Sequence, residues 1–214
     1  MIVEQAGKVA TIAPDYSKSP PRRGLKPLLS AQAESQRTCA KLGRSAVPIT
    51  GRKQNVIEMF EEAKKEDIGL IHYAGQGASN VEKAEYAQLF LEDTDLRALD
   101  IRRKETRLGK NRHSLVFFNA CGAGAPSLNL GVMGGFAEAL IEDRFGSFIA
   151  PLWSVVDVDA SSVIFDFLEN VLLAEEGHPR TFADALQKIR YASEEESPTF
   201  LSYTYYGDVM ASFV

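Results

Sequence analysis

Three short apolar runs limit what this chain can fold into more than any other feature of its sequence. They are IGLIHYA at 68–74, LVFFN at 115–119 and FIAPLW at 148–153. None of them alternates apolar with polar residues, which is typical of strands that are buried on both faces of a sheet. Helical patterns lie between and after these runs. The sequence therefore predicts an α/β fold with a mostly parallel sheet covered by helices on both sides.

The rest of the chain adds further elements to this framework. Residues 1–28 are the least defined, and PDYSKSPPRRGLKPL is expected to be a loop whose basic residues (Lys18, Arg22, Arg23 and Lys26) are solvated. Gly43 stands where the first helix is expected to end. Helices are predicted at 29–42, 53–65, 134–144, 160–175 and 181–192, and additional strands at 8–12, within 86–92 and in the C-terminal YTYYGDVMASFV.

Composition excludes several classes of protein. A length of 214 residues suits one α/β domain, and no internal repeat or domain boundary is visible. The net charge of −5 argues against an electrostatic nucleic-acid binder. There is no signal-peptide pattern and no apolar run near the ~20 residues of a membrane helix. We therefore expect a cytoplasmic protein with free thiols, with no membrane contact, no metal site and no cofactor.

Two of the apolar runs end in unusual residues. One ends HYAGQG, with Gln76 and Gly77, and the other ends FFNACGAG, with Cys121 and Gly122. Ligands of open parallel sheets sit at the carboxyl ends of the strands. Small neighbours such as Gly122 would leave the Cys121 sulfur accessible and let a substrate backbone approach, as nucleophilic catalysis requires. The alternative is that Cys121 is a buried core thiol, because cysteine is among the most buried residue types.

Several blocks of the sequence, taken together, carry a family resemblance. They are AQAESQRTCAKLG, HYAGQG, NACGAG, GGFAEALIEDRFGSFIAPLWSVVDVDAS and TFADALQKIR, from about residue 30 to the C-terminus. In these blocks the chain is similar to CHAT domains, which are relatives of caspases, separase and gingipain-like peptidases. The resemblance implies a caspase-like three-layer α/β/α sandwich over residues 1–214. It also implies a single domain. This domain is expected to be the C-terminal domain of a larger protein or complex that carries a sensor or repeat domain.

The resemblance also assigns roles to residues of the two strand ends. It makes Cys121 the nucleophile, and it places Gln76 where the family has its general-base histidine. The backbone N–H groups of Gly77 and Cys121 would form an oxyanion hole. A glutamine amide has no nitrogen that titrates near neutral pH, so it can neither take a proton from a thiol nor return one to a leaving amine.

No other histidine is expected to replace this base. His72 lies four residues before Gln76, about 13 Å along the strand, and is expected to be a core histidine. His113 stands at the start of the Cys121 strand, at the wrong edge of the sheet, and His178 lies in a Gly/Pro turn between helices.

Trp153, Asp157 and Gly122 are the expected substrate-binding residues. A carboxylate after Trp153 would receive a basic substrate side chain, as in relatives that cleave after Arg or Lys. Asp157 either has this role or caps a helix, whereas Asp159 is expected to cap the helix that starts near Ala160.

Three functions follow as hypotheses. The first is a CHAT domain whose active site is lost or crippled, acting as a binding or regulatory module for a peptide partner. The second is a working cysteine endopeptidase in which Cys121 is activated by another route. The third is a sheet edge that binds a small ligand, which ranks last because no phosphate-binding glycine loop is present.

Overall fold

The computed structural model of the chain describes most residues, with gaps between the described ranges. At Cys121, Gly122 and Asp157 the description covers the backbone. The described ranges are 7–17, 25–61, 67–78, 86–102, 107–122, 130–172, 180–192 and 197–213.

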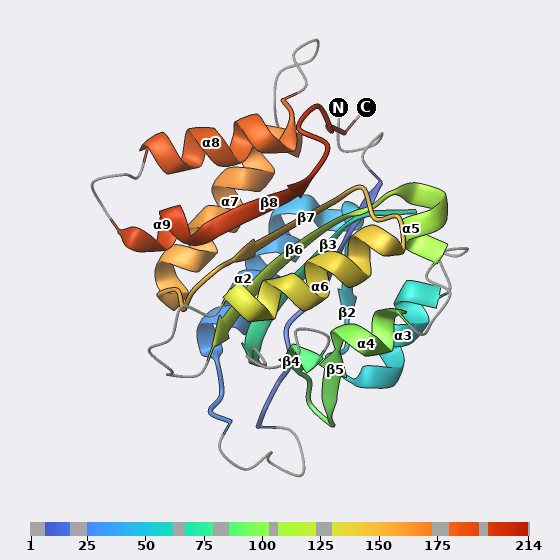
Figure 1. Ribbon diagram of the computed structural model, residues 1–214. Coiled ribbons are helices and arrows are strands. Elements are labelled where there is room, and N and C mark those ends of the chain that lie inside the picture. The colour runs from blue at the N-terminus through green and yellow to red at the C-terminus, as the bar shows by residue number, and fades with distance from the viewer. Residues whose placement is uncertain are drawn as a thin grey trace.

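Within these ranges, eight strands form one mixed sheet (Figure 1). Six of them follow the order β2-β1-β3-β6-β7-β8, in which all neighbours are parallel except the antiparallel pair β7–β8. A hairpin of β4 and β5 extends from the end of β3. The strands are β1 (Lys8–Ile12), β2 (Ala46–Ile49), β3 (Ile68–Ala78), β4 (Gln88–Phe90), β5 (Asp95–Arg97), β6 (Leu115–Gly122), β7 (Ser147–Pro151) and β8 (Tyr203–Gly207).

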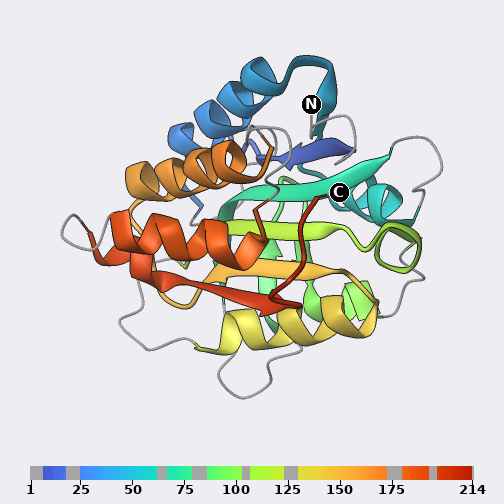
Figure 2. The same ribbon diagram turned by 90° about the horizontal axis from the view of Figure 1, so that it is seen from above.

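Helices cover both faces of the sheet, so the fold has three layers, as predicted. In Figure 1, α6 lies in front of the sheet and α2 behind it, and Figure 2 shows the same arrangement from above. α7 and α8 lie on the α2 side, while α3, α4 and α5 lie on the α6 side. The helices are α2 (Leu29–Leu42), the 3-10 turn η1 (Gly43–Ser45), α3 (Lys53–Glu61), α4 (Ala98–Arg102), α5 (Arg107–Arg112), α6 (Leu130–Glu142), α7 (Asp157–Leu172), α8 (Phe182–Ala192) and α9 (Pro198–Ser202).

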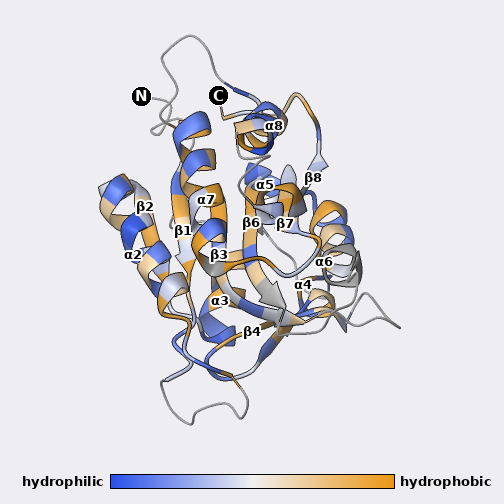
Figure 3. Ribbon diagram, turned by 90° about the vertical axis from the view of Figure 1, so that its left-hand side faces the viewer, coloured by the Kyte–Doolittle hydropathy of each residue, from blue (hydrophilic) through white to orange (hydrophobic). Residues whose placement is uncertain are grey.

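The unalternated apolar runs fill two cores, one on each face of the sheet. Successive residues of a strand point to opposite faces. Leu70 and Phe117 accordingly join the core under α7 and α8, whereas Ile71 and Phe118 join the core under α6. Figure 3 shows hydrophobic residues gathered where helices meet the sheet. This double burial is the reason why these segments carry no polar alternation.

Several predicted boundaries need correction. β3 continues to Ala78 and β6 to Gly122, beyond the predicted ends of the apolar runs at 74 and 119, so Gln76, Gly77 and Cys121 lie within the strands. α7 begins at Asp157, three residues before the expected start, so Asp159 lies inside the first turn. The predicted cap at Asp159 is therefore wrong. Its carboxylate instead accepts a hydrogen bond from the Ser197 hydroxyl at 2.6 Å.

Candidate active site

The two strands that end in unusual residues are direct neighbours. β3 and β6 pair in parallel, and the register sets Gln76 opposite Cys121 and Gly77 opposite Gly122. Neighbouring strands lie about 4.8 Å apart, so the backbones of these residues meet at one sheet edge. The prediction that Gln76 and Cys121 lie on adjacent parallel strands is confirmed. That their side chains face one cleft stays a prediction, because the Cys121 side chain lies outside the description.

The side chain and backbone of Gln76 are both held by hydrogen bonds. Its Nε2 donates to the Lys26 carbonyl oxygen at 2.9 Å, and the residue is 8% exposed. Its backbone N–H donates to the Tyr16 hydroxyl at 2.9 Å, and the Tyr73 hydroxyl donates to its carbonyl oxygen at 2.8 Å. Because the side-chain nitrogen, the backbone N–H and the backbone carbonyl of Gln76 each have a partner, the residue is held in place at the strand end.

These hydrogen bonds with the two tyrosines require a glycine at position 75, because there is no space for a side chain there. A Cβ atom at this position would lie 2.6 Å from the Tyr73 hydroxyl oxygen and 2.9 Å from that of Tyr16. Both tyrosines are almost completely buried. Sequence reasoning missed them, because Tyr73 sits inside an apolar run and Tyr16 in a segment expected to be a loop. The glycine before Gln76 was the available signal of a close approach at this place.

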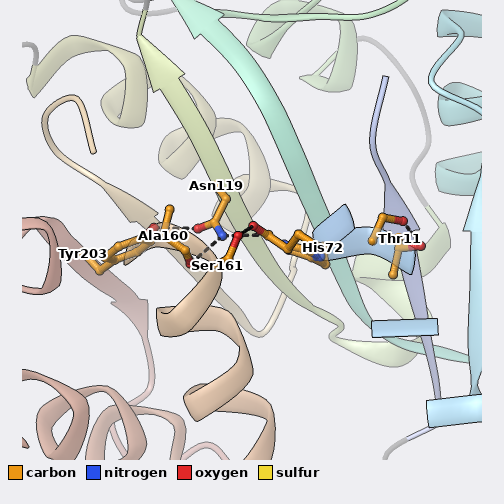
Figure 4. A network of polar contacts seen from close by, with 8 residues as sticks. Thr11, His72, Asn119, Ala160, Ser161 and Tyr203 are labelled. Atoms are coloured by element: carbon orange, nitrogen blue, oxygen red, sulfur yellow. Dashed lines mark hydrogen bonds and ion pairs between the residues drawn. The ribbon is translucent and has the colours of Figure 1, made fainter. Parts of the chain in front are cut away.

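A buried polar cluster lies on the α2 and α7 side of the sheet and includes residues of β3 and β6 that precede the two strand ends (Figure 4). Asn119 is its centre: Nδ2 donates to a Glu34 oxygen at 2.8 Å and to the Ala160 carbonyl at 3.0 Å, and Oδ1 accepts from the Tyr203 hydroxyl at 2.6 Å. Asn119 therefore ties β6 to α2, α7 and β8, close to the position of Cys121.

His72 belongs to this cluster, which confirms it as a core histidine. Its Nε2 lies 2.7 Å from Glu34 Oε1, and its side chain is fully buried. The other described histidine, His113, stands before β6 with φ +52°, and its Nδ1 lies 2.8 Å from the Arg144 carbonyl oxygen. The ring of His72 is therefore engaged by Glu34, and His113 stands at the amino end of β6. His178 lies outside the described residues.

Two of the three predicted substrate-binding residues lie beyond the carboxyl end of the neighbouring strand β7, and the third, Gly122, ends β6. Trp153 stands in the connection from β7 to α7 and is 36% exposed, and Asp157 opens α7. Val156 and Val158 of the same segment are also exposed, which gives this rim an apolar surface. The roles of Trp153, Asp157 and Gly122 in substrate binding stay predictions.

The family model described as the CHAT domain matches residues 8–202, nearly the whole described fold including β1. The chain belongs to the CHAT family. The match begins at β1, about twenty residues earlier than the sequence blocks had indicated. No curated protein matches this CHAT domain significantly.

Solved structures with a similar fold are peptidases of the caspase-like kind. Separase from Saccharomyces cerevisiae, in its complex with securin, aligns with a TM-score of 0.56 and 13% identity, over 94% of this chain and 12% of the separase chain. The Arg-specific cysteine proteinase gingipain R aligns with a TM-score of 0.57 and 14% identity, over all of this chain and 49% of the other. The complex of the pro- and mature domains of Porphyromonas gingivalis RgpB gives 0.57 and 14%, over 98% and 49%. This CHAT domain thus has a caspase-like fold and spans half or less of each of these chains.

Two negative findings apply to the described part of this CHAT domain. None of its helices has the length and apolar character needed to cross a bilayer. No group of three His, Cys, Asp or Glu side chains there is arranged to hold a metal ion.

The cluster around Glu34 predicts a dependence of stability on pH. Burial alone would raise the pKa of Glu34, but hydrogen bonding and charge from His72, with hydrogen bonds from Ser161 and Asn119, hold it below its ordinary value of about 4.5. A depressed folded-state pKa contributes stability that is complete above the unfolded value and is lost as the pH falls through the folded value. We therefore expect the free energy of unfolding to fall more steeply below pH 4.5 in the wild type than in Glu34→Gln. Urea titrations between pH 6 and pH 3 measure both slopes, and parallel slopes would contradict the assignment.

Proposed function

We propose that this CHAT domain is a cysteine endopeptidase domain in which Gln76 occupies the general-base position, so that it hydrolyses peptide bonds slowly or not at all as it stands. The observation that supports this most strongly is the register of the sheet. It sets Gln76 directly opposite Cys121 at the carboxyl ends of two central strands. This is the edge at which open parallel sheets bind their ligands.

The chemistry of the two residues determines the expected impairment. A free thiol has a pKa of about 8.5, so only a few per cent of it is thiolate at neutral pH. A histidine would raise the reactive fraction and then protonate the leaving amine. A glutamine amide does neither. The described histidines offer no replacement, because His72 is paired with buried Glu34 and His113 stands at the opposite end of β6.

Position 76 is nevertheless suited to a histidine. The Lys26 carbonyl oxygen now accepts a hydrogen bond from the Gln76 amide. One ring N–H of a histidine at this position would donate to the same carbonyl, which fixes the tautomer and leaves the other nitrogen unprotonated. The unprotonated nitrogen is the group that accepts a thiol proton. The surroundings of Gln76 therefore favour the base role for this position.

Substrate binding is proposed to use other groups at the carboxyl ends of the same strands. The backbone N–H groups of Gly77 and Cys121 would stabilise an oxyanion, and Trp153, Asp157 and Gly122 would contact the peptide. A carboxylate at position 157 would select a basic side chain before the cleaved bond, a preference shared with the Arg-specific gingipain R. We therefore propose a peptide or protein substrate with a basic residue.

The alternative function is a non-catalytic binding or regulatory module that uses the same edge for a peptide partner. The ordered position of Gln76 favours it, because a fixed amide can hold a peptide without turning it over. In either case we propose a cytoplasmic setting and a sensor or repeat domain in the same protein or complex.

The test measures peptide binding and peptide cleavage in parallel, for the wild type and for Gln76→His. Peptides with Arg or Lys before the cleaved bond serve as ligands. The peptidase proposal predicts similar binding by both forms and cleavage chiefly by the His form. Binding by both forms without cleavage by either would favour the module, and the absence of both would exclude this edge as a peptide site.

The two cysteines should differ in reactivity. Cys39 is half-buried in α2, and its sulfur lies 3.5 Å from the Thr11 hydroxyl oxygen. Cys121 lies at the carboxyl end of the central strand β6, at the edge of the sheet where open parallel sheets bind their ligands. We expect brief treatment with iodoacetamide to label Cys121 faster than Cys39, because accessible thiols at such edges react first. Peptide mass spectrometry measures both sites, and faster labelling of Cys39 would count against Cys121 as the nucleophile.

A further inference from the structure

A separate cavity of about 450 Å³ opens at the carboxyl ends of β1 and β2, on the other side of β1 from the β3–β6 edge. Its walls come from four places in the chain: β1 and the segment after it, one face of α2, the segment that leaves β2, and the turn between β4 and β5. Its lining residues are Thr11, Ala13, Asp15, Gln32, Ser35, Gln36, Pro48, Ile49, Thr50, Gly51 and Glu92.

Glu92 is the unusual member of this lining. It is 7% exposed, and one carboxylate oxygen accepts the Asp15 backbone N–H at 3.2 Å. No described cation pairs with it. The basic side chains that follow β2 form ion pairs with other carboxylates. Arg52 lies 3.8 Å from Asp93, and Lys53 lies 2.6 Å from Asp100. A carboxyl group that is buried without a cation beside it is costly to ionise, so a glutamate at this position is an unusual feature to retain.

The backbone around Glu92 is tightly packed. Its N–H donates to the Gly51 carbonyl at 2.7 Å, and a Cβ atom on Gly51 would lie 2.6 Å from Pro14 Cα. The segments that follow β1 and β2 therefore meet without room for a side chain. This contact fixes the backbone of Glu92, which is one of the residues that line the cavity.

We propose that this cavity binds an organic cation, an amine or guanidinium group on an aliphatic stem. The carboxylate of Glu92 matches the charged head, and the hydroxyl and amide oxygens of α2 provide further acceptors. Pro48 and Ile49 offer an apolar surface to the stem. Lysine and arginine side chains, and free polyamines, have this combination of stem and head.

The lining argues against other ligand classes. None of the described lining residues carries a positive charge, so an anion would meet carboxylates without a cation to balance it. A tightly bound divalent metal would need more acidic or histidine ligands, and the described residues hold no group of three. The volume lies within the range of small-molecule sites. The proposal is independent of Cys121 and of any peptidase activity.

The test uses the wild-type protein with two probes of nearly equal shape, n-butylguanidinium and neutral n-butylurea. NMR titration follows backbone amide signals, above all that of Asp15, whose N–H contacts Glu92. We expect the guanidinium to shift this signal saturably and to bind at least about tenfold more tightly than the urea. Binding should weaken as salt is added, because it depends on charge.

A variant without the Glu92 charge provides the second part of the test. Glu92→Gln keeps the shape and an acceptor for the Asp15 N–H but removes the charge. It should weaken guanidinium binding at least about tenfold and raise the melting temperature of the free protein. Glu58→Gln, on the exposed side of α3, should change neither. Equal binding of the two probes by the wild type, no saturable binding, or unchanged affinity in Glu92→Gln would each overturn the proposal.

Discussion

Gln76→His is expected to raise the rate of peptide cleavage by about 10²- to 10⁴-fold, the usual contribution of a positioned general acid–base group. The gain follows from proton transfer, because the new ring deprotonates Cys121 and later protonates the leaving amine. The Lys26 carbonyl, which now holds the Gln76 amide at 2.9 Å, orients that ring. Fluorogenic peptides that end in Arg or Lys before the cleaved amide measure the change in kcat/KM.

Two further variants make this result specific. Gln76→His combined with Cys121→Ala should lose the gain, because the nucleophile is absent. Gln54→His places the same ring on the exposed surface of α3 and should leave the rate at the wild-type level. If the wild type cleaves as fast as Gln76→His, position 76 is not the base and the proposed site is misplaced.

Glu34→Ala is expected to reduce the free energy of unfolding by about 3–5 kcal/mol, because it leaves several buried polar groups without their partner at about 1–3 kcal/mol each. The change leaves His72 without its carboxylate, which lies 2.7 Å away. It also removes the acceptor of the Asn119 amide and of the Ser161 hydroxyl. Urea unfolding followed by circular dichroism measures the loss.

Glu169→Ala is the matched control for this prediction. Glu169 is also a helical glutamate with an ion-pair partner, Lys41, but its side chain is 55% exposed. Exposed pairs contribute little, so the loss should stay below about 1 kcal/mol. A loss of similar size in the two variants would show that the Glu34 cluster is not a buried network in solution.

The strands of the central sheet could be predicted because burial on both faces leaves a clear pattern. IGLIHYA and LVFFN are continuous apolar runs, and each divides its side chains between the two cores. β2 was not predicted, because Pro48 interrupts AVPI. The strand tolerates this proline since it lies at the edge of the sheet, where one side of its backbone needs no partner.

The position of the candidate site was also predictable, whereas the residues that hold the site in place were not. Glycines beside Gln76 and Cys121 pointed to the two strand ends, and the register confirmed that these ends are neighbours. The hydroxyls of Tyr16 and Tyr73, which hold the Gln76 backbone, come from distant or apolar segments. The contact of Asn119 with Glu34 joins residues 85 positions apart. Such contacts depend on tertiary packing and leave no periodic signal in the sequence.

The central claim is that position 76 governs the proton of the Cys121 thiol, and the rate of Cys121 alkylation as a function of pH tests it most directly. This measurement needs no knowledge of the substrate. In the wild type, the alkylation rate should rise with pH as for an ordinary thiol, with the midpoint of the rise at about pH 8.5. In Gln76→His, the midpoint should fall by more than about one pH unit, because a neighbouring imidazolium stabilises the thiolate. Identical profiles for the two forms would contradict the claim.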